Sequence, residues 1–181
     1  MKITGAGLDG AFIIDPLRHE DERGFFMRTW CRREFAERGL NAELAQCGAS
    51  FNRKKGTLRG MHYQAKPYEE DKLVRCATGA IYDVIIDLRP GSKTFRQWAG
   101  AELAARSRRM IYIPKGFAHG FLTLEDDTEV CYQMSEFHHP ECAKGVRWND
   151  PAFGIEWPGR VLVISDKDRG YGAFDPAGMG P

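Results

Sequence analysis

Short apolar runs separated by turn-forming residues are the feature of this sequence that most constrains its fold. Runs rich in Val, Ile, Tyr, Phe and Leu are interrupted by Gly, Pro or Asp about every 8 to 12 residues, a pattern typical of all-β proteins. Strands are predicted at 11–14, 24–29, 44–51, 57–63, 72–77, 80–88, 97–104, 109–113, 119–124 and 128–134. One short peripheral helix is expected at 32–38, because helix-forming residues there are followed by Gly39.

The segment 80–88, "AIYDVIIDL", predicts a strand with two largely apolar faces. Because side chains alternate along a strand, one face carries Tyr82, Val84, Ile86 and Leu88, and the other carries Ile81, Asp83, Ile85 and Asp87. Carboxylates on an otherwise apolar face favour a sandwich or barrel with a polar-lined internal cavity. Exposure of Asp83 and Asp87 to solvent is the alternative interpretation.

Composition limits the class of protein. The 181 residues, 43% of them hydrophobic, are enough for a single domain with one sizeable core. The 26 basic and 25 acidic side chains nearly balance, and no basic stripe indicates a nucleic acid or a membrane as partner. The first residues lack the apolar core of a signal peptide, and no segment reaches the roughly 18 apolar residues of a membrane span. A cytoplasmic location is therefore expected.

The cysteines carry no metal-binding or disulfide signature. There are five, with no C-x-x-C pair: Cys31, Cys47, Cys76, Cys131 and Cys142. An odd set without that spacing favours neither a disulfide framework nor a structural zinc site. We predict that they are buried free thiols.

Two of the five histidines lie in contexts that indicate a site. His62 lies in "GTLRGMHYQ", and His119 follows a Pro-x-Gly turn in "IPKGFAHGFLTL". A metal site in a cupin-type barrel has about four ligands, including a second histidine two residues after the first. Gln64 occupies that position, and the histidine pair at 138–139 is expected to be exposed. The sequence therefore predicts no bound metal.

Without a metal, His62 and His119 together with Lys72, Tyr132 and aspartate residues are suited to proton transfer. A neutral histidine is a base near pH 7, a tyrosine is a neutral acid, and a lysine stabilises developing negative charge on oxygen. This set predicts removal of a proton next to a carbonyl, stabilisation of the enolate and return of a proton. The alternative is structural, since a strand histidine or tyrosine is commonly a core residue.

Six segments with specific motifs occur in order along the chain. They are "DERGFF" (21–26), "GTLRGMHYQ" (56–64), "KLVRCATGAIYDVIIDLRPGSKTFRQW" (72–98), "IPKGFAHGFLTLEDDTEVCY" (113–132), "GVRWNDPAFGIEWP" (145–158) and "SDKD" (165–168). Together they resemble the dTDP-4-dehydrorhamnose 3,5-epimerase family. The resemblance covers nearly the whole chain and implies an all-β, cupin-like double-stranded β-helix (jelly roll) over 1–181.

The resemblance also implies an activity and partners. Members act as homodimers with exchanged N-terminal segments, use no metal or cofactor, and bind a nucleotide-linked 4-keto-6-deoxyhexose. They invert C3 and C5, the carbons beside its C4 ketone. Residues 170–181 are expected to form a tail.

By motif match, the resemblance implies roles for individual residues. His62 is the general base, Asp168 orients its imidazole, Tyr132 is the general acid, and Lys72 stabilises the enolate. Arginine forks suit the diphosphate, and the implied substrate-binding set is Arg23, Arg28, Gln46, Arg59, His119, Lys167 and Asp83.

Arg59 and His62 pose a geometric problem, because residues three apart point to opposite faces of a regular strand. Gly60 lies between them, and glycine permits a bulge or a local twist. We therefore expect a bulge at Gly60 that turns both side chains inward, or an arginine that reaches substrate from the strand edge.

The chain departs from the family pattern at positions implied to touch the nucleotide. Arg28 stands where the family usually has a glutamate, Gly48 where it has an asparagine, and Ala143 near a family glutamate. Phe137 stands where many members have a second tyrosine. The alternatives are therefore a CDP-, GDP- or UDP-linked sugar, and inversion of only C3 or C5. A metal-dependent cupin and a non-catalytic nucleotide-sugar-binding protein are the remaining hypotheses.

Overall fold

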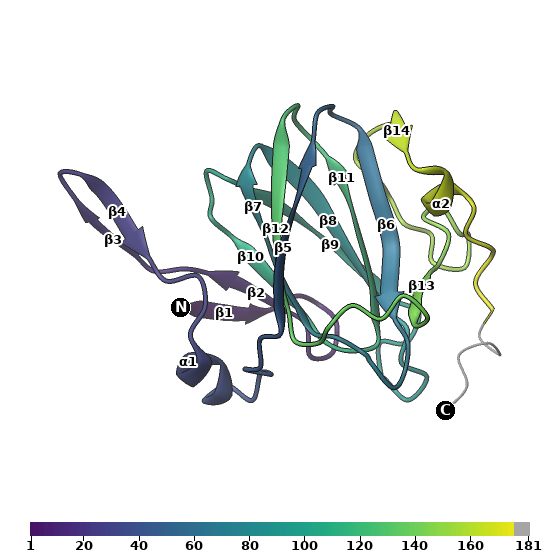
Figure 1. Cartoon of the computed structure of the whole chain (residues 1–181), viewed down its shortest axis with the longest axis horizontal. Coiled ribbons are helices and arrows are strands. Elements are labelled where there is room, and N and C mark those ends of the chain that lie inside the picture. Colours follow the sequence, from purple (N-terminus) through teal and green to yellow (C-terminus); the bar gives the residue numbers. More distant parts are fainter. Residues whose placement is uncertain (176–181) are drawn as a thin grey trace.

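Two antiparallel sheets pack face to face in the computed structural model of the chain, which describes residues 1–175 (Figure 1). The first sheet has the order β1 (Lys2–Gly5), β2 (Phe12–Asp15), β10 (Met110–Ile113), β7 (Lys72–Thr78), β12 (Thr128–Met134) and β5 (Gln46–Asn52). The second has the order β13 (Ala143–Gly145), β6 (Thr57–Gln64), β11 (Phe117–Thr123), β8 (Ala80–Asp87) and β9 (Trp98–Ala104). From β5 to β12 the chain passes repeatedly between the sheets, which confirms the predicted jelly roll.

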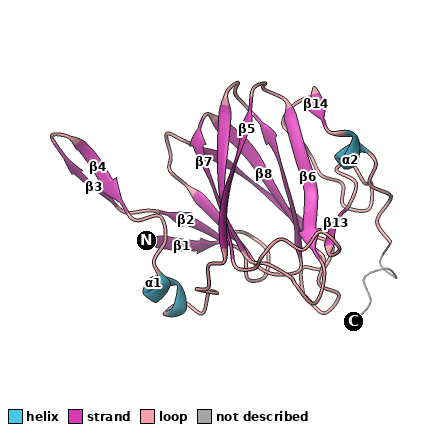
Figure 2. Cartoon of the chain, viewed as in Figure 1, coloured by secondary structure: helices cyan, strands magenta, loops and turns pink. Residues whose placement is uncertain are grey.

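Every strand predicted from the sequence overlaps a strand of the structure, and strands dominate the fold (Figure 2). The hydrophobic pattern missed β1, β13 and β14 (Val163–Ile164), which are two to four residues long. It also missed β3 (Arg18–Asp21), whose side chains are polar and exposed. Short or fully exposed strands carry no alternation for such a pattern to detect.

The two described helices are short and peripheral, as expected. The helix predicted at 32–38 is α1 (Arg32–Ala36), which ends two residues earlier than predicted. It ends there because the chain tightens into three-residue turns before Gly39, which has a φ of +68°. The second, α2 (Asp166–Arg169), was not predicted. Within residues 1–175, no helix has the length and apolar character needed to cross a membrane.

Strand β8 contributes to the core on both faces, as predicted. Ile81 and Ile85 pack between the two sheets with residues of β7, β10 and β12. The opposite face of β8 is covered by the chain after β13, and the residues buried there include Val84, Ile86, Leu88, Val146 and Phe153. This cover makes the sheet that carries His62 a buried layer rather than a solvent-facing one.

Asp83 and Asp87 are both fully buried, so the alternative that they face solvent is wrong. Asp87 lies at the end of β8 and accepts hydrogen bonds from the side chains of Arg89, Ser92 and Thr94. Asp83 points between the sheets instead and contacts His119. Only Asp83 therefore belongs to the polar interior that the sequence predicted.

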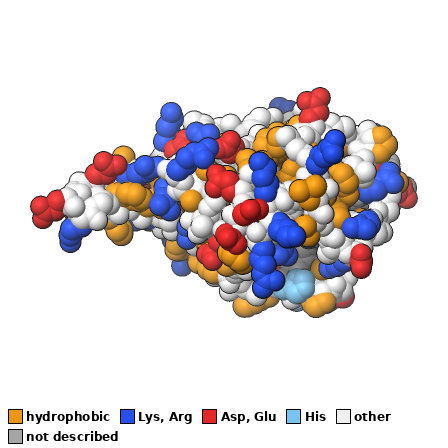
Figure 3. Space-filling model, turned by 90° about the horizontal axis from the view of Figure 1, so that it is seen from above, with side chains coloured by type: hydrophobic (Ala, Val, Ile, Leu, Met, Phe, Trp, Pro, Cys, Tyr) orange, Lys and Arg blue, Asp and Glu red, His pale blue; other side chains and the backbone are white. Residues whose placement is uncertain are grey.

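A hairpin of β3 and β4 (Gly24–Met27) projects from the body of the molecule (Figure 1). Its exposed apolar residues include Phe25 and Phe26, and Leu17 just before it is 63% exposed. Figure 3 shows hydrophobic side chains on this projection among charged ones. The single chain leaves this apolar surface uncovered.

All five cysteines are free, as predicted, but the prediction that they are buried is wrong for most of them. Cys76 is buried, Cys47 is exposed, and the others are partly exposed. The reason is strand alternation, because Val130 and Tyr132 of β12 face the core and Cys131 between them faces outward.

Candidate active site

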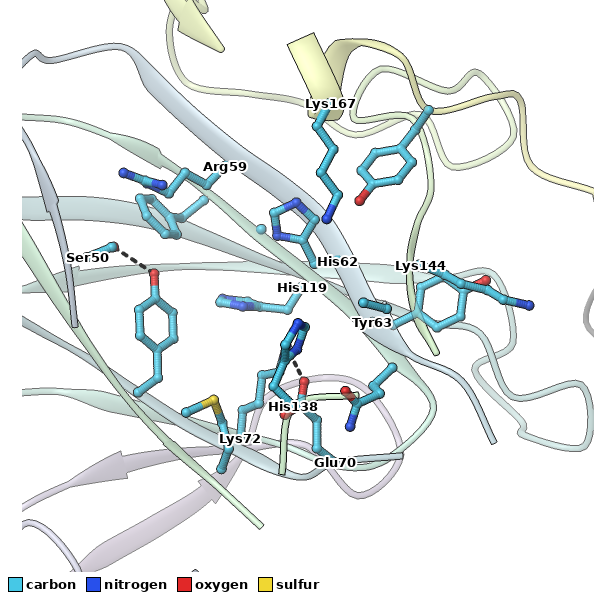
Figure 4. Close-up of a pocket in the computed structure, with 17 residues that line it drawn as sticks. Ser50, Arg59, His62, Tyr63, Glu70, Lys72, His119, His138, Lys144 and Lys167 are labelled. Atoms are coloured by element: carbon cyan, nitrogen blue, oxygen red, sulfur yellow. Dashed lines mark hydrogen bonds and ion pairs between the residues drawn. The ribbon is translucent and has the colours of Figure 1, made fainter. Parts of the chain in front are cut away.

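A cavity of about 340 Å³ opens between the two sheets (Figure 4). Strands β5, β7 and β12 line one side, and β6 and β11 line the other. The predicted residues on its wall are Arg59, His62, Lys72, His119, Tyr132 and Lys167. Asp168 and Asp83 lie behind the two histidines, each in contact with one of them. Most of the predicted site is thus brought together by one chain.

His62 is held by Asp168 of α2. Its Nε2 lies 2.7 Å from Asp168 Oδ1, and Asp168 Oδ2 accepts a hydrogen bond from the Gly60 N–H at 3.0 Å. Burial alone would raise the pKa of Asp168, but the hydrogen bonds from His62 and Gly60 outweigh it and hold that pKa below its usual range. An ionised carboxylate only accepts hydrogen bonds, so Nε2 carries the proton and Nδ1 of neutral His62 is left unprotonated, as a base requires.

The expected bulge occurs at Gly60. His119 pairs with His62 and Phe121 pairs with Arg59, so β6 holds one extra residue between these pairs. Gly60 has a φ of +129°, and a Cβ atom there would lie 2.6 Å from the Cα of Gly120. Only glycine fits this conformation and this close approach. The bulge explains how Arg59 and His62, three residues apart, both reach the cavity.

Helix α2 fixes Asp168 relative to β6. Its N-cap is Ser165, whose Oγ accepts a hydrogen bond from the Asp168 N–H at 3.1 Å. The preceding β14 pairs in parallel with Thr57 and Leu58 of β6, which ties the segment to the strand that carries His62. A single helical turn has no hydrophobic period, so only the family resemblance pointed to Asp168.

Tyr132 faces the cavity from the opposite sheet. Its hydroxyl lies 2.9 Å from Ser50 Oγ, the contact drawn at the left of Figure 4. Burial raises the pKa of Tyr132 to about 12, although the hydrogen bond with Ser50 acts in the opposite direction. The phenol therefore carries its proton at neutral pH and is able to donate it.

His119 connects the two walls of the site. It is the cross-strand neighbour of His62, and its ring centroid lies 6.4 Å from that of Tyr132. Its Nε2 lies 2.8 Å from Asp83 Oδ2. Burial raises the pKa of Asp83, although His119 and Lys72 act in the opposite direction. Asp83 Oδ1 is buried with no hydrogen-bond partner among the described residues, unlike the fully bonded carboxylate of Asp168.

The cavity wall carries more positive than negative charge. Lys72 is mostly buried, with its Nζ 3.0 Å from Glu70 Oε1. The guanidinium of Arg59 is oriented by Asn52, which accepts a hydrogen bond from its Nε at 2.7 Å. Lys144 and Lys167 add two further cations, while Glu70 is the one carboxylate among the lining residues that the structure describes. The site is therefore suited to an anionic ligand.

Gln64, which replaces a cupin metal ligand, is used to tie two loops together. Its Nε2 donates hydrogen bonds to the carbonyl oxygens of Tyr68 and Phe137, and its Oε1 accepts one from the His139 N–H. Within residues 1–175, no three His, Cys, Asp or Glu side chains are grouped so that they could hold a metal ion.

Three predicted substrate-binding residues lie outside this cavity. Arg23 lies on the projecting hairpin and Arg28 follows it, and each forms an exposed ion pair with a nearby carboxylate. The Oε1 of Gln46 accepts a hydrogen bond from the His138 N–H at 2.6 Å. A single chain therefore does not bring these three together with His62.

Sequence reasoning missed other residues on the cavity wall, including Ser50, Tyr63, Lys144 and Tyr171. Ser50 and Tyr63 lie on predicted strands, but alternation gave no signal for Tyr63, since the residue next to His62 points to the opposite face of a regular strand. Tyr171 belongs to the predicted tail 170–181, yet its ring lies 6.0 Å from that of His62. The rest of that tail, from 176 onward, lies outside the described residues.

Comparisons with known proteins agree with the fold. The family model described as dTDP-4-dehydrorhamnose 3,5-epimerase matches residues 6–175. An enzyme of that name from Methanothermobacter thermautotrophicus is 46% identical over 91% of this chain and 89% of its own length.

Two solved structures are also similar. A dTDP-4-dehydrorhamnose 3,5-epimerase from Bacillus anthracis, with TDP and PPi bound, has a TM-score of 0.92 and 38% identity over 96% of this chain and 99% of its own. A dTDP-6-deoxy-D-glucose-3,5-epimerase from Legionella pneumophila, in complex with dTDP-4-keto-L-rhamnose, has a TM-score of 0.87 and 37% identity over 92% and 89%. The chain therefore belongs to the dTDP-4-dehydrorhamnose 3,5-epimerase family of isomerases.

Proposed function

We propose that this chain inverts C3 and C5, the carbons beside the C4 ketone, of a dTDP-linked 4-keto-6-deoxyhexose. The observation that carries the proposal is that the His62–Asp168 pair and Tyr132 face one cavity from opposite sheets. A sugar ring between them presents one face to a base and the other to an acid, as inversion of a carbon requires. The relatives that bind TDP or dTDP-4-keto-L-rhamnose support a dTDP-linked substrate.

Each inversion consists of two proton transfers. Nδ1 of His62 takes the proton from the carbon beside the ketone, and the electron pair of the C–H bond moves through the carbonyl to its oxygen. Lys72 and His119, both on the cavity wall, stabilise the resulting enolate oxygen. Tyr132 then donates its proton to the same carbon from the other face, and the carbonyl forms again. The His62 imidazolium and the tyrosinate return to their starting states by proton exchange with water.

The cations of the cavity are assigned to the diphosphate. Arg59 offers a fork of N–H donors held in place by Asn52, and Lys167 adds a mobile positive charge at the wall. Both lie on the same side of the molecule as His62, on β6 and α2. An alanine at Arg59 is expected to raise KM for the substrate more than it lowers kcat, because it removes binding that is the same in the ground and transition states.

The protein is proposed to act as a homodimer in which the hairpin with Arg23 completes the partner's site. Support comes from the exposed Phe26 and Leu17, and from Arg23 lying on a projecting hairpin rather than at its own cavity. A mixture of the Arg23→Ala and His62→Ala variants, after subunit exchange, is expected to recover up to about a quarter of wild-type activity. Random exchange makes half of the dimers mixed. Each mixed dimer has one site in which both His62 and the partner's Arg23 are present, so a quarter of all sites are intact. No recovery would mean that Arg23 acts within its own chain, and an Arg23→Ala variant as active as the wild type would mean that Arg23 does not act at the site.

The reaction is tested by deuterium incorporation from heavy water into dTDP-4-keto-6-deoxy-glucose, followed by mass spectrometry and NMR. Incorporation at both C3 and C5, with inversion, is the expected result. Incorporation at one carbon means a mono-epimerase, and none means another nucleotide or a non-catalytic protein. The CDP-, GDP- and UDP-linked sugars, tested in parallel, address the departures at Arg28, Gly48 and Ala143.

The metal-dependent alternative has its own test. The described residues offer no ligand group of three, so activity is expected to be unchanged after dialysis against a strong chelator. Loss of activity together with loss of a stoichiometric metal would contradict the acid–base mechanism.

A further inference from the structure

Tyr171 is a cavity residue to which neither the motifs nor the proposed proton transfers assign a role. It follows α2 directly, two residues after the helix ends. Its ring centroid lies 6.0 Å from that of His62, with an interplanar angle of 71°, which is an edge-to-face contact. Asp168 and Tyr171 therefore come from the same segment and contact the His62 imidazole on two different sides.

The Tyr171 ring packs against Gly145 of β13. A Cβ atom at Gly145 would lie 2.3 and 2.4 Å from two carbons of the Tyr171 ring, so the ring rests directly on the backbone of the strand. Gly145 is also the cross-strand partner of His62. The absence of a side chain at Gly145 therefore lets the ring lie next to the imidazole, since any larger residue would occupy its place.

We propose that Tyr171 is a positioning residue, which holds the His62 imidazole in the plane where Nε2 faces Asp168 and Nδ1 faces the substrate. This inference rests on the proposed function. The hydrogen bond to Asp168 fixes one ring atom of His62 but leaves the ring able to tilt about that contact. The His62 side chain is 39% exposed, so the protein does not enclose it on every side. The edge-to-face contact supplies a second fixed point.

The contact is made by the aromatic ring, and the phenol hydroxyl is not required. Burial, with Asp168 and Tyr63 acting in the same direction, raises the pKa of Tyr171, so its phenol is neutral before the reaction begins. It takes no part in the proton transfers, for which His62 and Tyr132 account.

Three variants test the ring against the hydroxyl. Tyr171→Ala removes the ring and is expected to lower kcat at least about tenfold with KM within about twofold, because a small misplacement of a reacting group lowers the rate strongly. Tyr171→Phe keeps the ring and is expected to stay within about twofold of wild type. Tyr68→Ala removes another aromatic contact to a histidine, the stacking on His139 at 3.5 Å, outside the cavity, and serves as the matched control.

The proposal is overturned by either of two kinetic results. A Tyr171→Ala variant with the wild-type kcat would show that the ring does not position His62. A Tyr171→Phe variant as slow as Tyr171→Ala would show that the hydroxyl acts directly.

A readout that is independent of turnover separates this inference from the proposed function. In the wild type, imidazole 15N NMR is expected to show His62 with the proton on Nε2, and Tyr171→Ala is expected to shift it toward an average of the two tautomers. Unchanged 15N shifts in Tyr171→Ala would overturn the positioning role. If the wild type acts on no 4-keto sugar while these shifts move as expected, the proposed function fails and the positioning role stands.

Discussion

Replacing Asp168 by asparagine tests the orientation of His62 at nearly constant volume. In the native chain the two carboxylate oxygens accept from different donors, Oδ1 from His62 Nε2 at 2.7 Å and Oδ2 from the Gly60 N–H at 3.0 Å. An asparagine has one acceptor oxygen and one donor nitrogen. It is therefore able to satisfy only one of the two donors.

The outcome depends on which donor keeps the oxygen. If the oxygen faces His62, the amide NH2 opposes the Gly60 N–H, and a buried unpaired donor costs about 1–3 kcal/mol. If the oxygen faces Gly60, the NH2 donates to Nε2 and the ring proton moves to Nδ1. A protonated Nδ1 cannot accept the proton of the substrate, so His62 no longer acts as the base. The second arrangement is favoured by roughly 10- to 100-fold. With the lost stabilisation of the imidazolium, we expect kcat to fall by about 10²- to 10⁴-fold.

The assay is deuterium incorporation at C3 and C5 of dTDP-4-keto-6-deoxy-glucose, with dTDP affinity measured by calorimetry to show that the binding site is intact. Asp166→Asn is the matched control, because Asp166 lies in the same helix and is exposed. Exchange by Asp168→Asn within about threefold of wild type would refute the role of the carboxylate in setting the tautomer.

Other predictions follow from the same geometry. Tyr132→Phe is expected to retain deuterium exchange but lose inversion, because His62 exchanges the removed proton with the heavy water and returns a deuteron from the same face. Inversion at the wild-type rate would contradict the role of Tyr132 as acid. Gly60→Ala is expected to destabilise the fold by at least about 2 kcal/mol, or roughly 4–8 °C in Tm, since the added Cβ would lie 2.6 Å from the Cα of Gly120. A variant with the wild-type Tm would refute this. The pKa values of Asp168 and Asp87 are lowered in the folded state, so both carboxylates stabilise the fold when they are ionised. This contribution is fully present above the ordinary carboxylate pKa and is lost as pH falls through the lower pKa values of the folded state. Urea midpoints that stay constant from pH 5 to pH 2.5 would contradict that.

The sequence predicted those parts of the fold whose physical cause is local. Strand β8 is an example, because a run of eight residues with alternating apolar faces already implies burial on both sides. The bulge at Gly60 was expected for a different reason, because the family resemblance assigned Arg59 and His62, three residues apart, to one site. The prediction of buried cysteines failed because it used residue type alone, whereas strand alternation turns Cys131 outward when Val130 and Tyr132 face the core.

The site was predicted less completely, because part of it depends on contacts between distant segments. Asp168 lies in a one-turn helix with no periodic signal, and the family resemblance alone identified it. Tyr171 gave no signal at all, since its role depends on the absence of a side chain at Gly145, which lies on another strand. Arg23 was predicted as a site residue, but a single chain keeps it on the projecting hairpin.

The central claim is that His62 removes the proton from the carbon beside the ketone. The measurement that tests it most directly is the deuterium content of dTDP-4-keto-6-deoxy-glucose after incubation with His62→Ala in heavy water, compared with the wild type under the same conditions. The account predicts incorporation at C3 and C5 with the wild type and none above background with the variant, while the variant still binds dTDP. Incorporation by His62→Ala at the wild-type rate would show that another residue is the base.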